Sequence, residues 1–355
     1  MDDTGANANP ETGYSPGAAR YHDKSRHHHP SSRPTNRRAY GALDLGTNNC
    51  RLLVARPSDD GFTVIDAFSR IVRLGEGLST TGRLSDRAID RAVDALAICA
   101  DKLRRRHVSL SRSVATEACR RAANARQFVS RVQRETGIAL DIISPQEEAR
   151  LAVLGCHILL EPGDGPALIF DIGGGSTELV LIEPGMPEPE ILSWYSAPWG
   201  VVSLAEKEFN DLTSLEDRLD TYARMRKRVA DSFADFASTL PTIGYQPRLL
   251  GTSGTVTTLA SVHLDLPHYD RNKIDGLNLP SVAMREVSQS LSHMSVPERA
   301  EIPCIGRERA DLVVAGCAIL EAILDIWPAE RIGIADRGIR EGILRSIMAK
   351  DSGPS

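Results

Sequence analysis

The chain has 355 residues, of which 41% are hydrophobic and 25% charged, and its formal net charge is −5 at pH 7. This length allows two domains of ordinary size, and the composition is typical of a soluble globular protein. The acidic balance gives no support to general nucleic-acid binding, which needs a strongly basic face, although a local basic groove for an anionic substrate is still compatible with it.

Six cysteines are scattered along the chain without a Cys-x-x-Cys pair, so zinc-binding spacing is absent and buried reduced thiols are expected. No apolar run reaches the roughly 18 residues that suggest a membrane span. The N-terminus lacks the apolar core of a signal peptide. These features predict a cytoplasmic protein with neither membrane nor nucleic-acid partners.

Residues 1–38 are rich in Gly, Asn, Pro, Ser, His and Arg and show no apolar periodicity. We expect a disordered tail there, and its three histidines at 27–29 are explained more simply by solvation than by metal binding. A second short tail is expected at 351–355. Between the tails we predict a first domain over 39–150 and a second over 151–350, whose last helix packs back toward the first.

The first domain is expected to begin with a β-hairpin over 41–56 that turns at Gly46-Thr47-Asn48-Asn49. The elements expected after it are, in chain order, a strand at 62–72, an amphipathic helix at 86–106 capped by Ser85 or Asp86, a short strand at 113–116, a helix at 118–135 ended by Gly137, a strand at 138–143, and a helix from Pro145 to about residue 160.

The second half starts in the same way, with strands at 167–171 and 178–182 around another glycine turn. The elements expected after it are a strand at 190–195, helices at 202–209 and 215–239, a buried strand at 248–250, a helix to 264, a long helix at 307–326, a strand at 332–335 and a helix at 338–348. This repeated organisation predicts an α/β fold of two domains with a cleft between them.

The most informative feature is the repeated Asp-x-Gly turn, because each copy lies between two apolar runs that predict strands. Glycines let backbone N–H groups approach a phosphate closely, and Ser and Thr hydroxyls add donors. Three consecutive glycines are costly for folding unless something approaches the backbone, so a plain hairpin turn is a stronger alternative for the first loop than for the second. The phosphate-binding candidates are Gly46, Thr47, Asn48, Gly173, Gly174, Gly175, Ser176 and Thr177.

The aspartates that open the two loops are too negative to contact phosphate directly. Asp44 and Asp171 are therefore candidates to hold Mg²⁺ through water, since this ion prefers few carboxylates and several waters. Glu178 ends the second loop and could join Asp171 at the metal; a solvent-facing strand residue is the alternative.

A third glycine turn, Gly251-Thr252-Ser253-Gly254-Thr255, precedes a predicted helix. The free N–H groups and the dipole of a helix N-terminus suit an anion. Gly251, Ser253 and Gly254 join the phosphate-binding candidates, with an ordinary capped helix start as the alternative.

With these three loops in order, the chain resembles the exopolyphosphatase / guanosine pentaphosphate phosphatase (Ppx/GppA) family in its short, two-domain form. The resemblance covers about residues 41–348. Further segments that carry it are 72–78, 115–124, 336–342 and the run Ile143-Ser144-Pro145-Gln146-Glu147-Glu148-Ala149-Arg150. It implies two actin-like ATPase domains of the ribonuclease H-like type that face an interdomain cleft.

The resemblance also implies roles for single residues. The second glutamate of the Glu-Glu-Ala-Arg motif is the catalytic base in this family, and here it is Glu148; the alternative is a carboxylate that only stabilises the helix dipole. Glu147, about 100° away on the helix, is expected to face elsewhere. From its chemistry alone, Arg120 is a candidate catalytic residue that could clamp a terminal phosphate through its planar fork, and Arg73 is a second candidate to bind phosphate. A surface salt bridge is the alternative for each.

The chain departs from the family pattern at three places. Asn49-Cys50-Arg51 replaces the more usual Ser-containing end of the first loop, and Glu117 replaces a small or polar neutral residue. Ser203 stands where an arginine often follows the Gly-Val-Val segment, here at 200–202. Basic runs at 104–107 and 224–228 are candidate tracks for a polymeric anion, although such runs are more often solvated helix faces. A homodimer is expected from the resemblance alone.

The implied activity is Mg²⁺-dependent hydrolysis of the terminal phosphate of inorganic polyphosphate, with guanosine pentaphosphate (pppGpp) as the alternative substrate. Two other functions fit the same scaffold, a kinase and a non-catalytic nucleotide sensor. No recognisable sugar pocket follows Gly254, which argues against the kinase. The presence of Asp44, Glu148, Asp171 and Glu178 together argues against the sensor.

Overall fold

The computed structural model describes residues 38–59, 61–185, 188–208, 214–240 and 248–351. Apart from Arg38, the predicted N-terminal tail and its histidine run lie outside these residues. The predicted tail at 351–355 also lies outside them, apart from Asp351.

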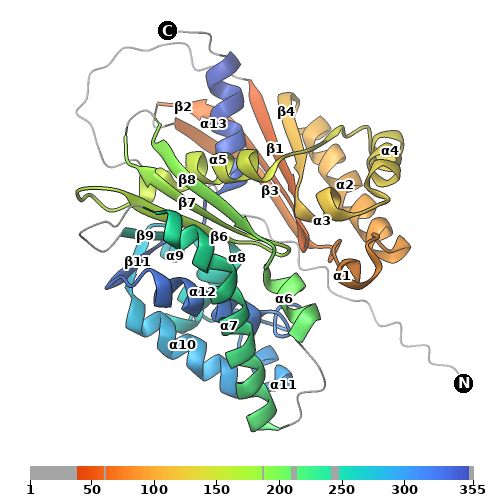
Figure 1. The fold of residues 1–355 in the computed structure, drawn as a ribbon. Coiled ribbons are helices and arrows are strands. Elements are labelled where there is room, and N and C mark those ends of the chain that lie inside the picture. The colour runs from red at the N-terminus through yellow and green to blue at the C-terminus, as the bar shows by residue number, and fades with distance from the viewer. Residues whose placement is uncertain (1–37, 60, 186–187, 209–213, 241–247, 352–355) are drawn as a thin grey trace, which may run out of the picture.

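The first sheet has five strands in the order β3-β2-β1-β4-β5 (Figure 1). Their bounds are Ala39–Leu45 for β1, Asn49–Ser58 for β2, Gly61–Ile71 for β3, Val108–Ala115 for β4 and Leu140–Ile142 for β5. The first three strands pair antiparallel, whereas β4 and β5 join in parallel.

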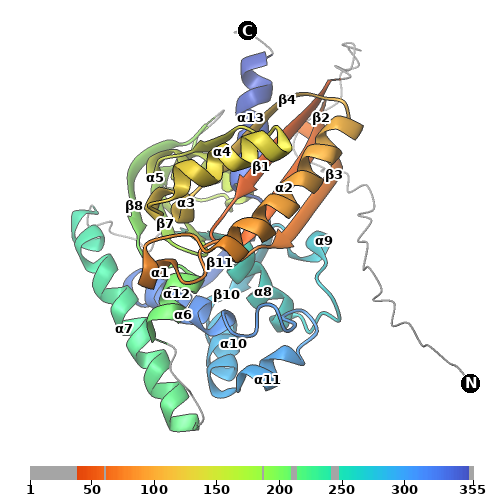
Figure 2. The same cartoon turned by 90° about the vertical axis from the view of Figure 1, so that its right-hand side faces the viewer.

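One face of the first sheet is covered by α2 (Asp86–Arg105) and α4 (Ala125–Thr136), as Figure 2 shows. As predicted, α2 begins at the cap residue Ser85, whose side chain accepts a hydrogen bond from Ala88 N. Its apolar stripe packs with that of α4 against the alternate, inward-facing residues of β1 and β2.

The second sheet repeats this topology. Its six strands run in the order β10-β11-β9-β6-β7-β8, with β6, β7 and β8 antiparallel, β9 and β11 parallel, and β10 added as an antiparallel edge strand. Their bounds are Ala167–Ile172 for β6, Thr177–Glu183 for β7, Glu190–Ala197 for β8, Arg248–Thr252 for β9, Leu277–Pro280 for β10 and Arg331–Ala335 for β11. The repeat confirms the predicted α/β fold with two similar halves.

The outer face of the second sheet packs against α7 (Leu215–Thr239), α8 (Ser253–His263), α10 (Ser281–His293) and α12 (Val313–Ile326), which together form the largest apolar core. Shorter helices complete this half: α6 (Val201–Glu208), α9 (Arg271–Ile274) and α11 (Val296–Ala300). Within the described residues, no helix combines the length and apolar character needed to cross a membrane.

Two helices lie between the sheets, α5 (Pro145–Cys156) and α13 (Ile339–Asp351) (Figure 1). α13 packs on the first sheet and α5 on the second, and the two helices also contact each other. They approach so closely at glycines that an ideal Cβ on Gly155 would lie 2.0 Å from Gly338 O, and one on Gly342 would lie 2.0 Å from Leu151 O. The last helix is therefore in direct contact with both halves.

Two helix predictions were wrong. The segment predicted as one helix over 118–135 forms α3 (Glu117–Arg121) and α4, because the buried side chain of Asn124 exchanges two 2.9 Å hydrogen bonds with the backbone of Leu84. The helix predicted to begin at 307 begins at Val313, after a series of turns in which Gly306 adopts a φ of 66°. The helix opened by Pro145 ends at Cys156, before a short 3₁₀ turn over His157–Leu159.

Candidate active site

A cleft between the two sheets is lined by the loops that follow their strands. From the first loop, Asp44, Gly46, Thr47 and Asn48 all line it. Gly46 N donates to Asn49 O at 2.9 Å and closes the predicted turn. The segment after β3 is bound to this loop, because Val72 N donates to Asn48 O at 2.8 Å and Gly75 N donates to Thr47 O at 2.9 Å.

The second loop faces the first across the cleft and lines it with Asp171, Gly173, Gly174, Gly175 and Ser176. Close packing against Thr47 of the first loop requires glycine at two of these positions. A Cβ on Gly174 would lie 3.0 Å from Thr47 Cβ, and one on Gly175 would lie 2.6 Å from Thr47 Oγ1. The two loops can touch only because these side chains are absent.

The third loop contributes Ser253 and Gly254 to the cleft, at the N-terminus of α8. Ser253 adopts a φ of 87° and its hydroxyl donates to Ile172 O at 2.6 Å, which fixes the third loop against the second. Two phosphate contacts predicted in the second and third loops do not line the cleft. Thr177 is buried and donates to Trp199 O, and Gly251 packs against the ring of Phe170.

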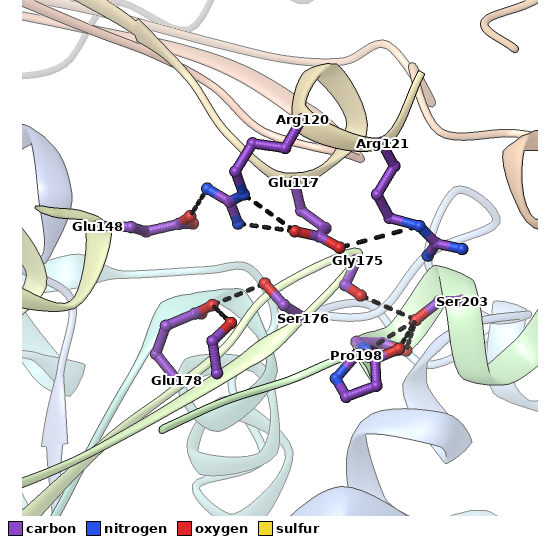
Figure 3. Close-up of polar contacts among 11 residues, drawn as sticks. Glu117, Arg120, Arg121, Glu148, Gly175, Ser176, Glu178, Pro198 and Ser203 are labelled. Atoms are coloured by element: carbon purple, nitrogen blue, oxygen red, sulfur yellow. Dashed lines mark hydrogen bonds and ion pairs between the residues drawn. The ribbon is translucent and has the colours of Figure 1, made fainter. Parts of the chain in front are cut away.

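Glu148 lines the cleft from the first turn of α5, which is capped by Ser144. The side chain is buried, and one carboxylate oxygen accepts a hydrogen bond from Arg120 Nη1 at 2.6 Å (Figure 3). Burial and then the negative charge of Glu178 raise the pKa of Glu148 well above its usual range, against the opposing effect of Arg120. As expected, Glu147 faces elsewhere and pairs with Arg112 at 2.7 Å.

Arg120 does not line the cleft but lies behind two carboxylates that do. Besides its contact with Glu148, its guanidinium donates to Glu117 Oε2 from two nitrogens, at 2.8 and 3.1 Å (Figure 3). It also donates to Ile143 O at 3.1 Å. Its donors are thus directed at Glu117 and Glu148 rather than at the space that a phosphate would occupy.

Glu178 is almost fully buried, which excludes the solvent-facing alternative. Its carboxylate accepts a hydrogen bond from Ser176 Oγ at 2.7 Å (Figure 3). It accepts another from Ser196 Oγ at 2.9 Å. Burial, followed by the charge of Asp171, raises its pKa to about 7. Glu178 lies beneath the second loop and does not line the cleft.

The two loop aspartates are buried carboxylates whose burial outweighs the favourable charge of the nearby Arg51. Burial raises the pKa of Asp171 to about 6 and also raises that of Asp44, whose Oδ1 finds no hydrogen-bond partner in the part of the chain that the structure describes. An unpaired buried carboxylate is costly, and a divalent cation would compensate it.

These aspartates fit Mg²⁺ held largely by water and substrate, which is this ion's usual mode of binding. Among the described residues, no three His, Cys, Asp or Glu side chains gather into a ready metal site. The donors present therefore do not resemble the closed set of protein ligands that a structural metal needs.

Sequence reasoning missed the arginines of the cleft. The cleft is also lined by Arg51 from β2, Arg309 from the segment before α12, Arg337 from the turn before α13, and Arg340 from the first turn of α13. Burial and then the charge of Arg51 lower the pKa of Arg309, so positive charges are held near one another there. Arg51 was noted only as a departure from a pattern, although it follows the first loop directly on a strand.

The other basic candidates lie elsewhere. Arg73 is not in the cleft lining, and its side chain pairs with Asp311 at 2.8 Å. The run at 104–107 is engaged with Asp101 and Asp66, and Arg224 and Arg228 of the other run both pair with Glu208. These contacts match the solvated-face alternative rather than a continuous anion track.

Comparisons with known proteins agree over most of the chain. A model of the Ppx/GppA phosphatase family matches residues 53–351. The chain is 31% identical over 322 residues to exopolyphosphatase 2 of Mycobacterium tuberculosis, which covers 86% of this chain and 97% of that protein. The solved structure of the Aquifex aeolicus Ppx/GppA family member is 29% identical, with a TM-score of 0.72 and coverage of 89% and 99%. An exopolyphosphatase structure from Cytophaga hutchinsonii is 25% identical, with a TM-score of 0.77 and coverage of 88% and 98%.

Proposed function

This chain belongs to the Ppx/GppA phosphatase family, and on that premise we propose that it releases the terminal phosphate of inorganic polyphosphate in a Mg²⁺-dependent reaction. Family membership together with its exopolyphosphatase relatives makes it a phosphoanhydride hydrolase. The substrate, the metal and the base are the parts of the statement that we propose.

The observation that carries the proposal is the position of Glu148. A buried carboxylate with a raised pKa lines the same cleft as the two glycine loops. Hydrolysis needs a group that orients and deprotonates water next to a held phosphoryl group. A carboxylate that served only the helix dipole would not need to be buried in the cleft.

The other residues of the cleft supply binding and charge. Backbone N–H groups of the first and second loops hold the terminal phosphate. Arg51, Arg309 and Arg340 offset the negative charge of the bound polyphosphate. Arg120 holds the carboxylate of Glu148 in place, and Glu148 takes a proton from the attacking water. When bound near Asp44 and Asp171, Mg²⁺ would neutralise charge on the phosphoryl oxygens.

Guanosine pentaphosphate is the alternative substrate. It ends in the same phosphoanhydride, and loops that bind through backbone N–H groups recognise phosphate rather than the group beyond it. Polyphosphate ranks first because a relative of this chain is named an exopolyphosphatase, and the nucleotide ranks second.

The test is a phosphate-release assay on polyphosphates of several lengths and on guanosine pentaphosphate, with and without Mg²⁺. We expect release that requires the metal and is fastest on polyphosphate. No release from either substrate would refute the hydrolase, and transfer from ATP to an added hydroxyl compound would favour the kinase instead.

A further inference from the structure

Arg73 connects the two halves of the molecule beside the cleft, without lining it. Its Nη1 donates to Asp311 Oδ2 at 2.8 Å and its Nη2 donates to Asp311 Oδ1 at 3.2 Å, so the contact is bidentate. Nη2 also donates to Glu308 O at 3.0 Å. Planar, two-pronged contacts of this kind fix orientation as well as distance.

The backbone of Arg73 is itself fixed to the first phosphate loop. Arg73 N donates to Asn48 O at 3.0 Å, beside the bond from Val72 N to the same oxygen. Arg73 has a φ of 45°, an uncommon conformation for a residue with a side chain. Arg91 supports it from α2 by donating to Val72 O at 2.9 Å and Arg73 O at 3.2 Å.

Asp311, the partner of Arg73, lies in the same segment as Arg309. Asp311 follows two positions after Arg309, which lines the cleft and donates to Thr258 Oγ1 at 3.1 Å. The segment precedes α12 and is built of turns. Its position relative to the first loop is therefore set by contacts such as that of Arg73.

A second contact binds the loop after β3 to the second half of the chain. Glu206 of α6 accepts a hydrogen bond from Gly77 N at 2.7 Å and another from Ser79 Oγ. The loop that begins at Arg73 is thus attached to the first phosphate loop by its backbone and to the second half at two points.

We propose that Arg73 is a positioning residue, which holds the segment of Arg309 at a fixed place opposite the first phosphate loop so that both act on one phosphate chain. This rests on the proposed function. The pair is about one-third exposed, at 34% for Arg73 and 38% for Asp311. Ion pairs this exposed add little to global stability, so its removal should alter the geometry of the cleft more than the fold.

The test compares Arg73→Gln, Asp311→Asn and the double variant with the wild type on the phosphoanhydride that the wild type hydrolyses. We expect each single change to lower kcat/KM by about 10- to 100-fold, as small displacements of binding groups do. The double variant should be hardly worse than either, because both changes remove one contact. The exchanged pair Arg73→Asp with Asp311→Arg should recover part of the loss.

Arg131→Gln is the matched control, because Arg131 is also 34% exposed and pairs with Asp90 at 2.8 Å away from the cleft. Its kcat/KM should equal that of the wild type. Strictly additive losses from Arg73→Gln and Asp311→Asn, or a kcat/KM unchanged by both, would overturn the proposal.

Hydrogen exchange separates a failure of this proposal from a failure of the proposed function. In Arg73→Gln, amide exchange should rise in both 46–49 and 306–312, and it should stay unchanged in Arg131→Gln. This readout needs no substrate, so it applies even if the wild type hydrolyses neither polyphosphate nor guanosine pentaphosphate. Unchanged exchange in both segments would refute the positioning role.

Discussion

Arg120 and Glu148 are in direct contact, with 2.6 Å between Arg120 Nη1 and Glu148 Oε2. The same guanidinium also binds Glu117, so one positive charge serves two carboxylates. This sharing leaves the charge of Glu148 only partly compensated. The pKa of Glu148 is accordingly raised by burial despite its arginine partner.

Replacing the proposed base should abolish turnover while leaving binding intact. We expect Glu148→Gln to lower kcat by roughly two to four orders of magnitude, the usual contribution of a general base. Binding can be measured by calorimetry with polyphosphate under conditions in which the variant does not turn over. Glu147→Gln is the matched control, since Glu147 pairs with Arg112 and Arg150 outside the cleft lining. Equal rates in the two variants would refute the assignment of Glu148 as the general base.

The rate should depend on pH through Glu148, and Glu117 should tune that dependence. A base with a raised pKa must lose its proton to act, so kcat/KM should rise with pH as Glu148 ionises. Glu117→Gln removes a nearby negative charge and leaves Arg120 to Glu148 alone, which favours the ionised carboxylate. We expect the acid limb of the pH profile to move to lower pH. A shift to higher pH would contradict the view that Glu117 and Glu148 share the charge of Arg120.

Stability should fall as the buried carboxylates ionise. In the folded chain the pKa is about 6 for Asp171 and about 7 for Glu178, whereas unfolded carboxyls titrate near 4. Their contribution is thus complete below about pH 4 and is lost as pH rises through 6 and 7. Between pH 5 and 8 the thermal midpoint should drop less in Glu178→Gln than in the wild type.

Mg²⁺ should reduce this drop at pH 8 and change little at pH 5, because a cation near Asp44 and Asp171 stabilises the ionised carboxylates. Glu183→Gln is the control for Glu178→Gln and should unfold like the wild type at every pH, since Glu183 is an exposed residue on the same strand as Glu178. A midpoint that is indifferent to the metal at pH 8 would count against a site at the two loop aspartates.

The crossing of α5 and α13 should tolerate no side chain at Gly155. A Cβ on Gly155 would lie 2.0 Å from the backbone oxygen of Gly338, so Gly155→Ala must push the helices apart. We expect a loss of about 1–3 kcal/mol in the free energy of unfolding, which is typical of overpacking. Activity should fall further than stability explains, because α5 carries Glu148 and α13 carries Arg340.

Denaturant unfolding measures this change. Gly185→Ala is a suitable control, since its Cβ would meet its nearest neighbour only at 3.4 Å, an ordinary contact. If Gly155→Ala unfolded at the same denaturant concentration as the wild type, the close crossing would not be a determinant of stability.

The sequence by itself determined the elements that depend on local chemistry. Ser85 caps the helix that it was predicted to cap, Pro145 opens α5 as predicted, and the Asp-x-Gly turns join antiparallel strands as expected. The repeated alternation of strands and helices was sufficient to predict two α/β halves. Hydrophobic periodicity, caps and turn residues act over a few neighbours, so they can be recognised without the fold.

The tertiary structure decided which side chains meet in the cleft. Arg51, Arg309 and Arg340 come from three distant segments, and the sequence does not show that the three meet at one cleft. Arg73 was predicted to contact phosphate, yet its guanidinium is bound by Asp311, which lies 238 positions further along the chain. The direction of a long side chain depends on the charges that folding brings within reach, and contacts of that kind leave no trace in local sequence.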